Sequence, residues 1–297
     1  MNIKTLLLLL LTSLITFVSC SKTDADEKNP DNTGSSIFKP LSDSTNIGKW
    51  KFKEDLSDEF DGNTINANKW LVQGTNGVFQ SNSIGRAPSQ YSTKNATVQD
   101  GKLKISVKWE PEFAFNSGVD KFGVKYENYT AAAVICKNEF LYGYMEIKCK
   151  AADASVSSSF WATGNQSELD IFEHFGKPSI RTTTKLSLET EMWSSIHDWS
   201  PAAAGASVWT TKTKLPYRVA DGFHVYACEW DKDFIKFFAD GKLIKEATRA
   251  EIGAGWVLTN PIKLWVNSVT WTWHGLPVKE DLPTSYDIEY IRVWQKN

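Results

Sequence analysis

The residues of this sequence that are best suited to chemistry are three carboxylates within residues 168–173, namely Glu168, Asp170 and Glu173. The side chains of an extended strand alternate between its two faces, so Glu168 and Asp170 share one face while the apolar residues between them point to the other. Glu173 falls out of this alternation. A β-bulge near Ile171-Phe172 would accommodate one extra residue and turn Glu173 toward the other two acids. We therefore expect the three carboxylates to share one surface.

Three neighbouring carboxylates indicate acid-base chemistry. Like charges raise one another's pKa, so one carboxyl group stays protonated near neutral pH while another is ionised. Such a pair hydrolyses glycosidic bonds, one group as proton donor and the other as carboxylate. The simpler interpretation is a solvated acidic face of a strand. The apolar residues that fill the gaps, and Phe160-Trp161 just upstream, favour a catalytic cluster.

The elements expected to hold these acids are strands. Alternation of apolar and polar residues, with turn residues between the segments, predicts strands over 102–108, 144–150, 234–238, 243–244 and 286–294. Asp240-Gly241 predicts a two-residue type I′ hairpin turn. No segment of twelve or more residues keeps a helical period. The sequence thus predicts an all-β fold, a β-jelly-roll sandwich of two antiparallel sheets, with the acids at the floor of a concave substrate groove.

The composition excludes one class of function and suggests another. The 297 residues carry 33 basic and 35 acidic side chains, a formal net charge of -2, whereas a nucleic-acid-binding protein needs a basic face. Thirteen tryptophans exceed ordinary usage, and some of them are candidates for stacking on sugar rings. Cys136, Cys149 and Cys228 lack metal-ligand spacing. We expect buried free thiols, with a Cys136–Cys149 bridge as the alternative.

Residues 1–20 resemble a bacterial lipoprotein signal peptide, because a leucine run follows Lys4 and a small residue precedes Cys20, the expected lipidation site. An ordinary secretory signal is the alternative, and both place the mature protein outside the cytoplasm. The acidic residues after Cys20 resemble an export signal of surface lipoproteins in Bacteroidetes-like bacteria. We expect a lipid anchor to the membrane and a place in the cell envelope, at the outer membrane or the cell surface. Residues 21–45 are polar and predict a flexible tether, and residues 46–297 predict one catalytic domain.

The sequence of this domain resembles glycoside hydrolase family 16. The family motif Glu-x-Asp-x-x-Glu on a bulged strand matches residues 168–173. Further similar segments lie at 56–62, Trp70, 142–146, 160–162, 223–230, 238–241 and 290–294. The resemblance implies a concanavalin A-like jelly roll and an endo-acting hydrolase that retains the anomeric configuration of the sugar.

The resemblance also implies a role for each acid. Glu168 is the nucleophile, Asp170 holds and tunes it, and Glu173 is the general acid/base. A retaining mechanism needs the two outer carboxyl groups about 5–5.5 Å apart, so that one attacks C1 while the other protonates the leaving oxygen. No metal or organic cofactor is required for this step.

Family 16 domains often carry a structural calcium on the convex side, away from catalysis. Glu59, Gly101 and Asp287 fall near the positions that could supply its oxygen ligands. Acids near strand ends are also ordinary surface features, so an ion-free arrangement is the alternative.

Residues 85–91 are similar to a segment of the agar-active members of the family, the β-agarases and β-porphyranases, in which an arginine faces the groove. Arg86 would hold a ring hydroxyl or, in porphyran, a sulfate, because a guanidinium suits planar oxyanions. A structural arginine paired with a surface acid is the alternative. The sequence departs from the agar-active pattern at Gln80-Ser81-Asn82, where an aromatic residue often precedes the arginine.

The other expected substrate-binding residues are five tryptophans and one histidine. Loops that border a groove often carry binding residues, and two loop-like segments near the acids are rich in aromatic residues. The first segment holds Trp193, His197 and Trp199, and the second holds Trp271 and Trp273. Trp161, in a strand pattern next to the acids, completes the expected set. A position in the core is the alternative for each tryptophan. Trp230 and Trp294 are expected in the core, His174 is expected to pack beside the site, and His224 to be structural.

These observations predict a protein that acts as a monomer on a polysaccharide and cleaves β-linked galactan of red algae, agarose or porphyran, by double displacement. An endo-β-1,3- or β-1,3-1,4-glucanase of the same fold is the first alternative. A non-catalytic surface carbohydrate-binding lipoprotein is the second, because jelly rolls also serve as lectins. The three acids argue against a lectin, since binding alone does not need them.

Overall fold

The structure, a computed structural model, describes residues 38–296. The predicted signal peptide, the lipidation site Cys20 and residues 21–37 of the predicted tether lie outside this range and stay predictions. Between residues 38 and 296, no helix is long and apolar enough to cross a membrane. The α-helices of this range are the four-residue segments α1 (Thr183–Leu186) and α2 (Arg249–Ile252).

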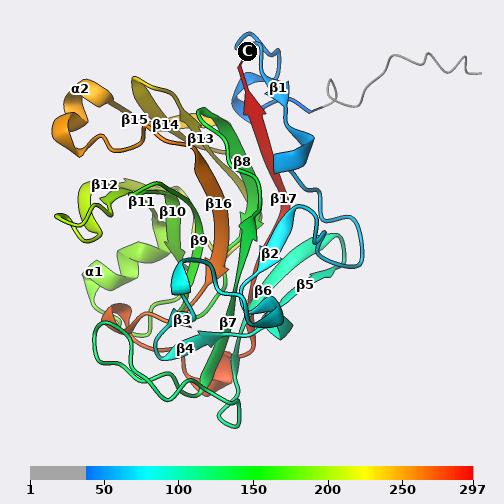
Figure 1. Cartoon of the computed structure of the whole chain (residues 1–297), viewed down its shortest axis with the longest axis vertical. Coiled ribbons are helices and arrows are strands. Elements are labelled where there is room, and N and C mark those ends of the chain that lie inside the picture. Colours follow the sequence, from blue (N-terminus) through cyan, green and yellow to red (C-terminus); the bar gives the residue numbers. More distant parts are fainter. Residues whose placement is uncertain (1–37, 297) are drawn as a thin grey trace, which may run out of the picture. The chain divides into compact units, whose positions relative to one another are not determined.

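Most of the described chain forms two sheets (Figure 1). The inner sheet has the strand order β2 (Trp70–Val72), β7 (Tyr129–Cys136), β16 (Ile262–Ser268), β9 (Ser157–Gly164), β10 (Ser167–Phe175), β11 (Glu191–Asp198), β12 (Ala206–Lys214). The outer sheet has the order β15 (Lys242–Thr248), β14 (Phe234–Ala239), β13 (His224–Trp230), β8 (Gly143–Lys150), β17 (Thr284–Gln295), β6 (Lys102–Trp109), β5 (Ala96–Gln99), and β1 (Lys51–Phe52) joins the end of β17. All of these pairs are antiparallel.

Two short strands, β3 (Gly85–Arg86) and β4 (Ser89–Tyr91), lie at the β7 side of the inner sheet. β3 and β4 pair with each other in antiparallel fashion, but β4 runs parallel to β7. The predicted all-β jelly-roll sandwich is confirmed, and this parallel pair is the departure from two purely antiparallel sheets.

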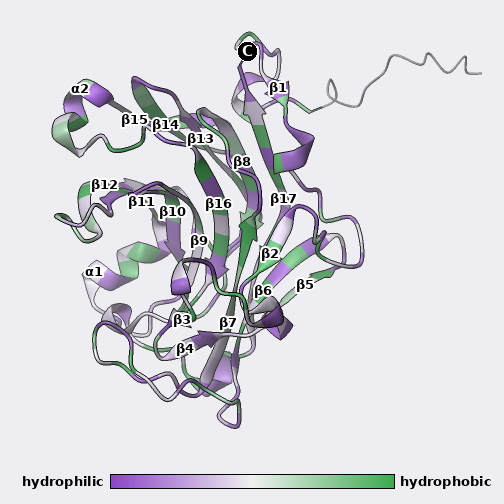
Figure 2. Cartoon of the chain, in the orientation of Figure 1, coloured by the Kyte–Doolittle hydropathy of each residue, from purple (hydrophilic) through white to green (hydrophobic). Residues whose placement is uncertain are grey.

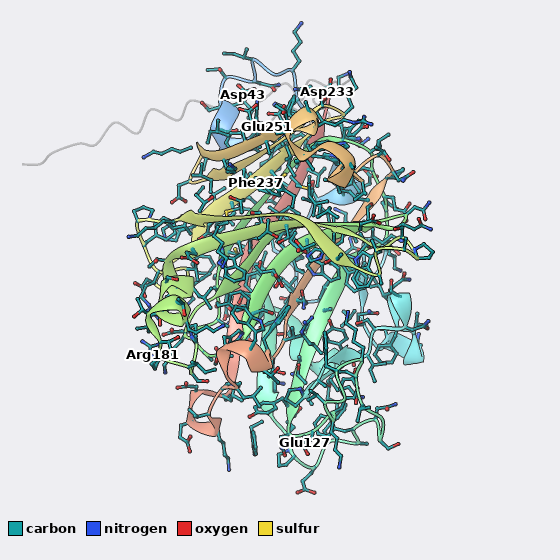
Figure 3. The ribbon with its side chains drawn as sticks, turned by 90° about the vertical axis from the view of Figure 1, so that its left-hand side faces the viewer. Asp43, Glu127, Arg181, Asp233, Phe237 and Glu251 are labelled. Atoms are coloured by element: carbon teal, nitrogen blue, oxygen red, sulfur yellow. The ribbon has the colours of Figure 1, made fainter. Side chains whose placement is uncertain are left out.

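The sandwich is held together by one apolar core between the sheets. In β6 the residues Leu103, Ile105 and Val107 are fully buried and alternate with lysines and Ser106, and Figure 2 shows the alternation as green and purple segments along β5 and β6. Across the two sheets, Trp209 of β12 stacks on Phe237 of β14 with ring centroids 5.9 Å apart, and Figure 3 labels Phe237 between the ribbons. Burial of such faces is what fixes the strand register.

Two hairpin turns have the backbone conformation that their residue types predict. Asp240 and Gly241 connect β14 to β15 with φ of 47° and 75°, the left-handed values that a type I′ turn requires. Asp100 and Gly101 make the same kind of turn between β5 and β6, with φ of 55° and 66°. The predicted hairpin at Asp240-Gly241 is confirmed.

The N-terminal end of the described chain packs on the outer sheet. The Phe38 ring lies 5.0 Å from the Phe52 ring, and Trp294 Nε1 donates a 3.0 Å hydrogen bond to the Phe38 carbonyl oxygen. The Leu41 backbone N–H donates to Glu146 Oε2 at 2.8 Å. Residues 38–45 therefore belong to the folded domain, which starts earlier than the predicted boundary at residue 46.

The three cysteines of the described chain are free and buried, as predicted. Cys136, Cys149 and Cys228 are each at most 1% exposed. Trp230 and Trp294 are likewise buried, 1% and 0% exposed, which confirms their assignment to the core.

Candidate active site

The three acids of the motif are brought together by a bulge in β10. Against β9, Asp170 pairs with Trp161 and Phe172 pairs with Phe160, so Ile171 has no partner of its own. Ile171 and Phe172 are both fully buried, which turns Glu173 back to the open face of the sheet. The Ser194 hydroxyl satisfies the buried backbone of the bulge by donating a 2.7 Å hydrogen bond to the Ile171 carbonyl oxygen. The predicted bulge is confirmed.

The strand register determines which side chains share the floor of the groove with the acids. On β9, Thr163, Trp161 and Ser159 lie opposite Glu168, Asp170 and Glu173. On β11, His197, Ser195 and Trp193 lie opposite the same three acids. Directly paired residues of adjacent strands point to the same face. The open face of the inner sheet is therefore a polar and aromatic surface.

This surface lines a cavity of about 810 Å³, large enough for several sugar units. All three acids line it. Of the predicted substrate-binding residues, the cavity wall includes Arg86, Trp161, His197, Trp199 and Trp271. Five of the seven residues predicted to bind substrate thus share one cavity with the three acids.

His197 links two of the acids. Its Nε2 lies 3.1 Å from Asp170 Oδ2 and 3.9 Å from Glu168 Oε1, while its Nδ1 lies 3.1 Å from the Gly205 carbonyl oxygen. The hydrogen bond with Asp170 raises the pKa of His197 to about 9, so the imidazole is protonated at neutral pH. His197 therefore supplies a positive charge to the acids.

The surroundings of the three acids favour their protonated forms. Burial, followed by the charge of Asp170, raises the pKa of Glu168 to about 8 and that of Glu173 to about 8. Burial also raises the pKa of Asp170, although the hydrogen bond from His197 lowers it. Such displaced pKa values are typical of catalytic carboxyl groups.

Glu168 and Glu173 differ in the support for their charged forms. Trp199 Nε1 donates a 2.9 Å hydrogen bond to Glu168 Oε2, and the His197 charge is nearby. Between residues 38 and 296, no side chain donates a hydrogen bond to the Glu173 carboxyl group. These contacts favour ionisation of Glu168 over that of Glu173, although burial raises the pKa of each to about 8.

Arg86 is positioned by a close approach of two strands. At Gly85, φ is 140° and a Cβ atom would lie 2.5 Å from the Ser89 carbonyl oxygen, so only glycine allows β3 and β4 to pair here. The Arg86 guanidinium carbon lies 3.2 Å from the centre of the Trp271 ring. The guanidinium has no ion-pair partner in the described chain, and the alternative of a structural arginine paired with a surface acid is not observed.

Two predicted substrate-binding residues do not line the cavity. Trp193 and Trp273 stack on each other, with ring centroids 5.4 Å apart and an angle of 19° between the planes. The prediction of a loop for Trp193 and His197 was wrong, because both lie in β11. Trp199 follows the end of β11, and Trp271 precedes the short turn Thr272–His274, so these two do lie in loops.

Sequence reasoning missed Trp265 and Asn267, which also line the cavity. The Trp265 ring lies 4.7 Å from the Trp161 ring, and Asn267 Oδ1 accepts a 2.7 Å hydrogen bond from Trp161 Nε1. The signal was present, because residues 262–268 alternate apolar residues with Lys263, Trp265 and Asn267. Tyr126 and Phe122, from the loop between β6 and β7, complete this side of the wall without any periodic signal.

The histidines outside the cavity are structural. His174 is fully buried and stacks on Phe172 with ring centroids 4.0 Å apart, and burial lowers its pKa to about 3. His224 lies in β13, and its Nδ1 is 2.8 Å from Asp240 Oδ2 next to the hairpin turn. Both fit the roles predicted for them.

The predicted calcium ligands do not form a suitable donor set. Arg292 binds both carboxylate oxygens of Glu59, at 2.8 and 2.7 Å, so a cation would have to displace a guanidinium. Asp287 accepts a hydrogen bond from Ser285, and Gly101 lies in the turn between β5 and β6. The calcium prediction is therefore not supported by these residues.

One group of described side chains is close enough together to share a cation. The carboxylates of Glu168 and Asp170 and a ring nitrogen of His197 have ligand atoms within 4.8 Å of one another. Both ring nitrogens of His197 face acceptor oxygens, Asp170 Oδ2 and the Gly205 carbonyl oxygen, each at 3.1 Å. The arrangement fits a proton-bearing imidazole better than a metal centre.

Comparison with known proteins agrees with the geometry. A family model described as "Beta-porphyranase A-D, GH16 domain" matches residues 50–296. The chain belongs to glycoside hydrolase family 16. Its predicted identity as a glycoside hydrolase is thereby confirmed, and the lectin alternative loses its support.

Several relatives are similar to this family 16 chain. A protein named Beta-porphyranase B from Zobellia galactanivorans is 28% identical over 268 residues, which covers 83% of this chain and 85% of the relative. A protein of the same name from Phocaeicola plebeius is 28% identical over 265 residues, 79% of each chain.

Solved structures show the same fold. The crystal structure of porphyranase B from Zobellia galactanivorans matches with a TM-score of 0.68 at 28% identity, covering 83% of this chain and 92% of that one. The catalytic domain of an endo-1,3-beta-glucanase (laminarinase) from Thermotoga petrophila matches with a TM-score of 0.64 at 26% identity, covering 84% and 98%. Beta-agarase A in complex with oligoagarose, at 19% identity and a TM-score of 0.68, shares the fold.

Proposed function

We propose that this family 16 hydrolase is a retaining, endo-acting galactanase that cleaves β-linked galactan of red algal type, with sulfated porphyran as its substrate in preference to agarose. The observation that carries the proposal is Arg86, whose guanidinium lines the same cavity as the acids and has no ion-pair partner in the described chain. An unpaired guanidinium in a binding cavity is suited to a sulfate ester. The names of the similar proteins, Beta-porphyranase B and E, support the same choice.

In this proposal Glu168 is the nucleophile and Glu173 is the general acid/base. A Glu168 oxygen forms a bond to the anomeric carbon, the bond from that carbon to the glycosidic oxygen breaks, and the leaving oxygen takes the proton of Glu173. Glu173 then takes a proton from water, whose oxygen attacks the anomeric carbon and releases Glu168. The hydrogen bond from Trp199 to Glu168, and the absence of one to Glu173 from the described residues, support this division of roles.

Asp170 and His197 act as positioning residues. The Asp170 carboxylate lies between the two glutamates in the sequence and is hydrogen-bonded to His197. The protonated imidazole offsets the charge of Asp170 and favours ionisation of Glu168, which lies 3.9 Å away. His197, predicted as a substrate-binding residue, has this second role through its neighbours.

The substrate class is tested by hydrolysis of porphyran, agarose, carrageenan, laminarin and lichenan, scored as new reducing ends. Release from porphyran above all others supports the proposal. New reducing ends from laminarin or lichenan alone would contradict the proposal and favour the glucanase alternative. The similarity to a laminarinase structure is the reason to include these two substrates. Arg86→Ala should raise KM on porphyran with less effect on agarose, whereas a purely structural arginine would lower activity on both alike.

The stereochemical course is tested by nuclear magnetic resonance of the first product formed. The β-anomer appears first if the configuration is retained, and the α-anomer appears first if it is inverted. Glu168→Gln should lose turnover but still bind oligosaccharide. An inverted first product would contradict the assignment of Glu168 as nucleophile.

We also propose that the protein is a monomeric lipoprotein of the cell envelope, anchored through Cys20. The sequence of residues 1–20 supports this proposal. In cells that express the full chain, Cys20→Ser should move the protein from the membrane fraction to the soluble fraction. A wild-type protein that is already in the soluble fraction would contradict the anchor, and size-exclusion chromatography of the domain tests the monomer.

A further inference from the structure

Two stacked indole rings, each with a lysine ammonium over it, stand beside the catalytic cavity. This group consists of Lys212, Trp193, Trp273 and Lys185, called here the lysine–indole column. The Lys212 ammonium lies 3.8 Å from the centre of the Trp193 ring, and the Lys185 ammonium lies 3.7 Å from the centre of the Trp273 ring. The two rings stack on each other with centroids 5.4 Å apart. Each indole thus has an ammonium on it and the other indole beside it.

The column is in register with the catalytic acids. Trp193 lies directly opposite Glu173 on the neighbouring strand, and Lys212 lies directly opposite Trp193 on the next one. Because neighbouring strands are ~4.8 Å apart, the Lys212 backbone is about 10 Å from that of Glu173 across the sheet. This is the direction across the strands of the concave face. The column therefore lies within reach of sugar units that flank the scissile bond.

The two ammonium groups of the column are not neutralised by nearby acids. Neither Lys185 nor Lys212 forms an ion pair with any residue from 38 to 296, whereas the neighbouring arginines Arg181 and Arg218 both bind Glu189. Figure 3 labels Arg181 beside α1, the helix that carries Lys185. The carboxylate of Glu191 accepts a 2.9 Å hydrogen bond from Trp193 Nε1. The Glu191 carboxylate is not within ion-pair distance of Lys185 or Lys212.

The lysines are also close enough to repel each other. The charge of Lys212 is one of the causes, after burial, that lower the pKa of Lys185. Two like charges held near each other favour the binding of an anion, because the anion offsets their repulsion. The indoles also restrict the ammonium positions, so less freedom is lost when an anion binds.

We propose that the lysine–indole column is a second anion subsite, which binds a sulfate ester on a galactan unit next to the scissile bond. This inference rests on the proposed function and extends it, because Arg86 serves one sulfate and the column serves another. Lys185 and Lys212 donate hydrogen bonds to sulfate oxygens, and the indoles hold the two ammonium groups in place. Trp193 and Trp273 thereby contribute to substrate binding through the lysines, and their stacked arrangement explains why they do not line the cavity.

The test compares the double variant K185Q/K212Q with the wild type on porphyran and on agarose. Gln removes the charge and keeps a polar side chain, which is one atom shorter than that of Lys. We expect KM for porphyran to rise about tenfold, at the low end of the loss caused by removing charge-assisted hydrogen bonds from partly exposed sites. We expect kcat on porphyran, and KM and kcat on agarose, to stay within about twofold. KM for porphyran should also depend less on salt in the double variant.

Lys214→Gln is the matched control. Lys214 lies two residues further along β12, opposite Glu191, and its ammonium is not placed over an aromatic ring. Removal of its charge should leave KM for porphyran within about twofold of the wild type. Circular dichroism and thermal unfolding of all variants check that they fold.

Three outcomes are distinguishable. A rise in KM for porphyran alone, absent in Lys214→Gln, supports the column as a sulfate subsite. An unchanged KM for porphyran in the double variant, or an equal rise in Lys214→Gln, overturns the inference and leaves the galactanase proposal intact. A wild-type protein that cleaves glucan but neither galactan refutes the proposed function, and the column inference with it.

Discussion

Replacement of Glu173 by Gln should inactivate the enzyme and stabilise the fold at alkaline pH. Burial and the neighbouring Asp170 raise the pKa of Glu173 from its usual 4.5 to about 8 in the folded protein. The folded state then binds more protons than the unfolded state between these two values, so the stability contributed by Glu173 is complete below pH 4.5 and is lost as the pH rises through 8. Gln keeps the shape of the protonated side chain and removes this loss.

The size of the effect follows from the shift in pKa. One unit corresponds to about 1.4 kcal/mol, so a fully buried group shifted this far would lose about 4–5 kcal/mol of stability on ionisation. Glu173 faces a cavity that water can enter, which screens its charge, so we expect about 2 kcal/mol at pH 9. For a domain of this size the melting temperature should rise by about 4–8 °C at pH 9 and change little at pH 4.5.

Calorimetry at pH 4.5 and pH 9 at equal ionic strength measures this difference. Glu246→Gln is the control, because Glu246 lies on the outer sheet, 3.6 Å from Lys236, and 42% of its side chain is exposed. The same Glu173→Gln variant should lose about 10²–10⁴-fold in kcat, the usual contribution of a general acid/base. An equal change in melting temperature at both pH values, or a loss of stability at pH 9, would refute the reasoning about its charge.

Two further perturbations test the same site, and a labelling experiment tests the core. His197→Gln should lower the free energy of unfolding by about 1–2 kcal/mol at pH 6 and have little effect at pH 10 in urea titrations, because the raised pKa of His197 adds stability below pH 6.5 that is lost as the pH rises through 9; an equal cost at both pH values would contradict this. Trp199→Phe removes the 2.9 Å hydrogen bond to Glu168, so kcat should fall about fivefold and the acidic limb of the pH–activity profile should move to higher pH. A profile with an unmoved acidic limb would show that the bond does not tune Glu168. The thiols of Cys136, Cys149 and Cys228 should not react with Ellman's reagent until the protein unfolds, since each is at most 1% exposed; fast labelling of the native protein would disprove their burial.

The arrangement of the acids could be predicted because the residues at the bulge themselves indicate it. Ile171 and Phe172 are consecutive large apolar residues, and both can be buried only if the strand departs from strict alternation. That departure returns Glu173 to the face of Glu168 and Asp170. The Asp240-Gly241 turn was predictable for a similar local reason, since both residues accept positive φ.

The strand character of residues 191–198 could not be recognised from its pattern. Met192, Ser194 and Ile196 are buried on the core face of β11, but a serine at the middle position hides the apolar alternation. Ser194 is there because its hydroxyl satisfies the Ile171 carbonyl oxygen at the bulge of β10. Ser194 thus interrupts the apolar pattern of β11 because of the bulge in β10. A contact between two strands of this kind cannot be read from the pattern of either strand alone.

The domain boundary and the calcium site show the same limit. Residues 38–45 are mostly polar, and their fixed position depends on contacts such as that of the Leu41 N–H with Glu146, which is far away in the sequence. Glu59 has the chemistry of a calcium ligand, but Arg292 at the other end of the chain occupies both of its oxygens. Residue type alone suggested a tether in the first case and a calcium ligand in the second. In both cases a contact with a residue far away in the sequence gives a different structure.

The site collects charges of both signs that the described residues do not fully compensate. Three carboxylates lie close together, and among residues 38–296 the one cation within ion-pair distance of them is His197, which contacts Glu168 and Asp170. Arg86, Lys185 and Lys212 stand on indole faces beside them without ion-pair partners from residues 38 to 296. The unpaired cations are suited to sulfate esters, and the carboxylates are suited to the positive charge that develops at the anomeric carbon. Because the buried charge of Glu173 costs stability above its pKa of about 8, Glu173→Gln should be more stable and less active there, whereas neutralisation of a paired and exposed surface charge such as Glu246 should change neither property much.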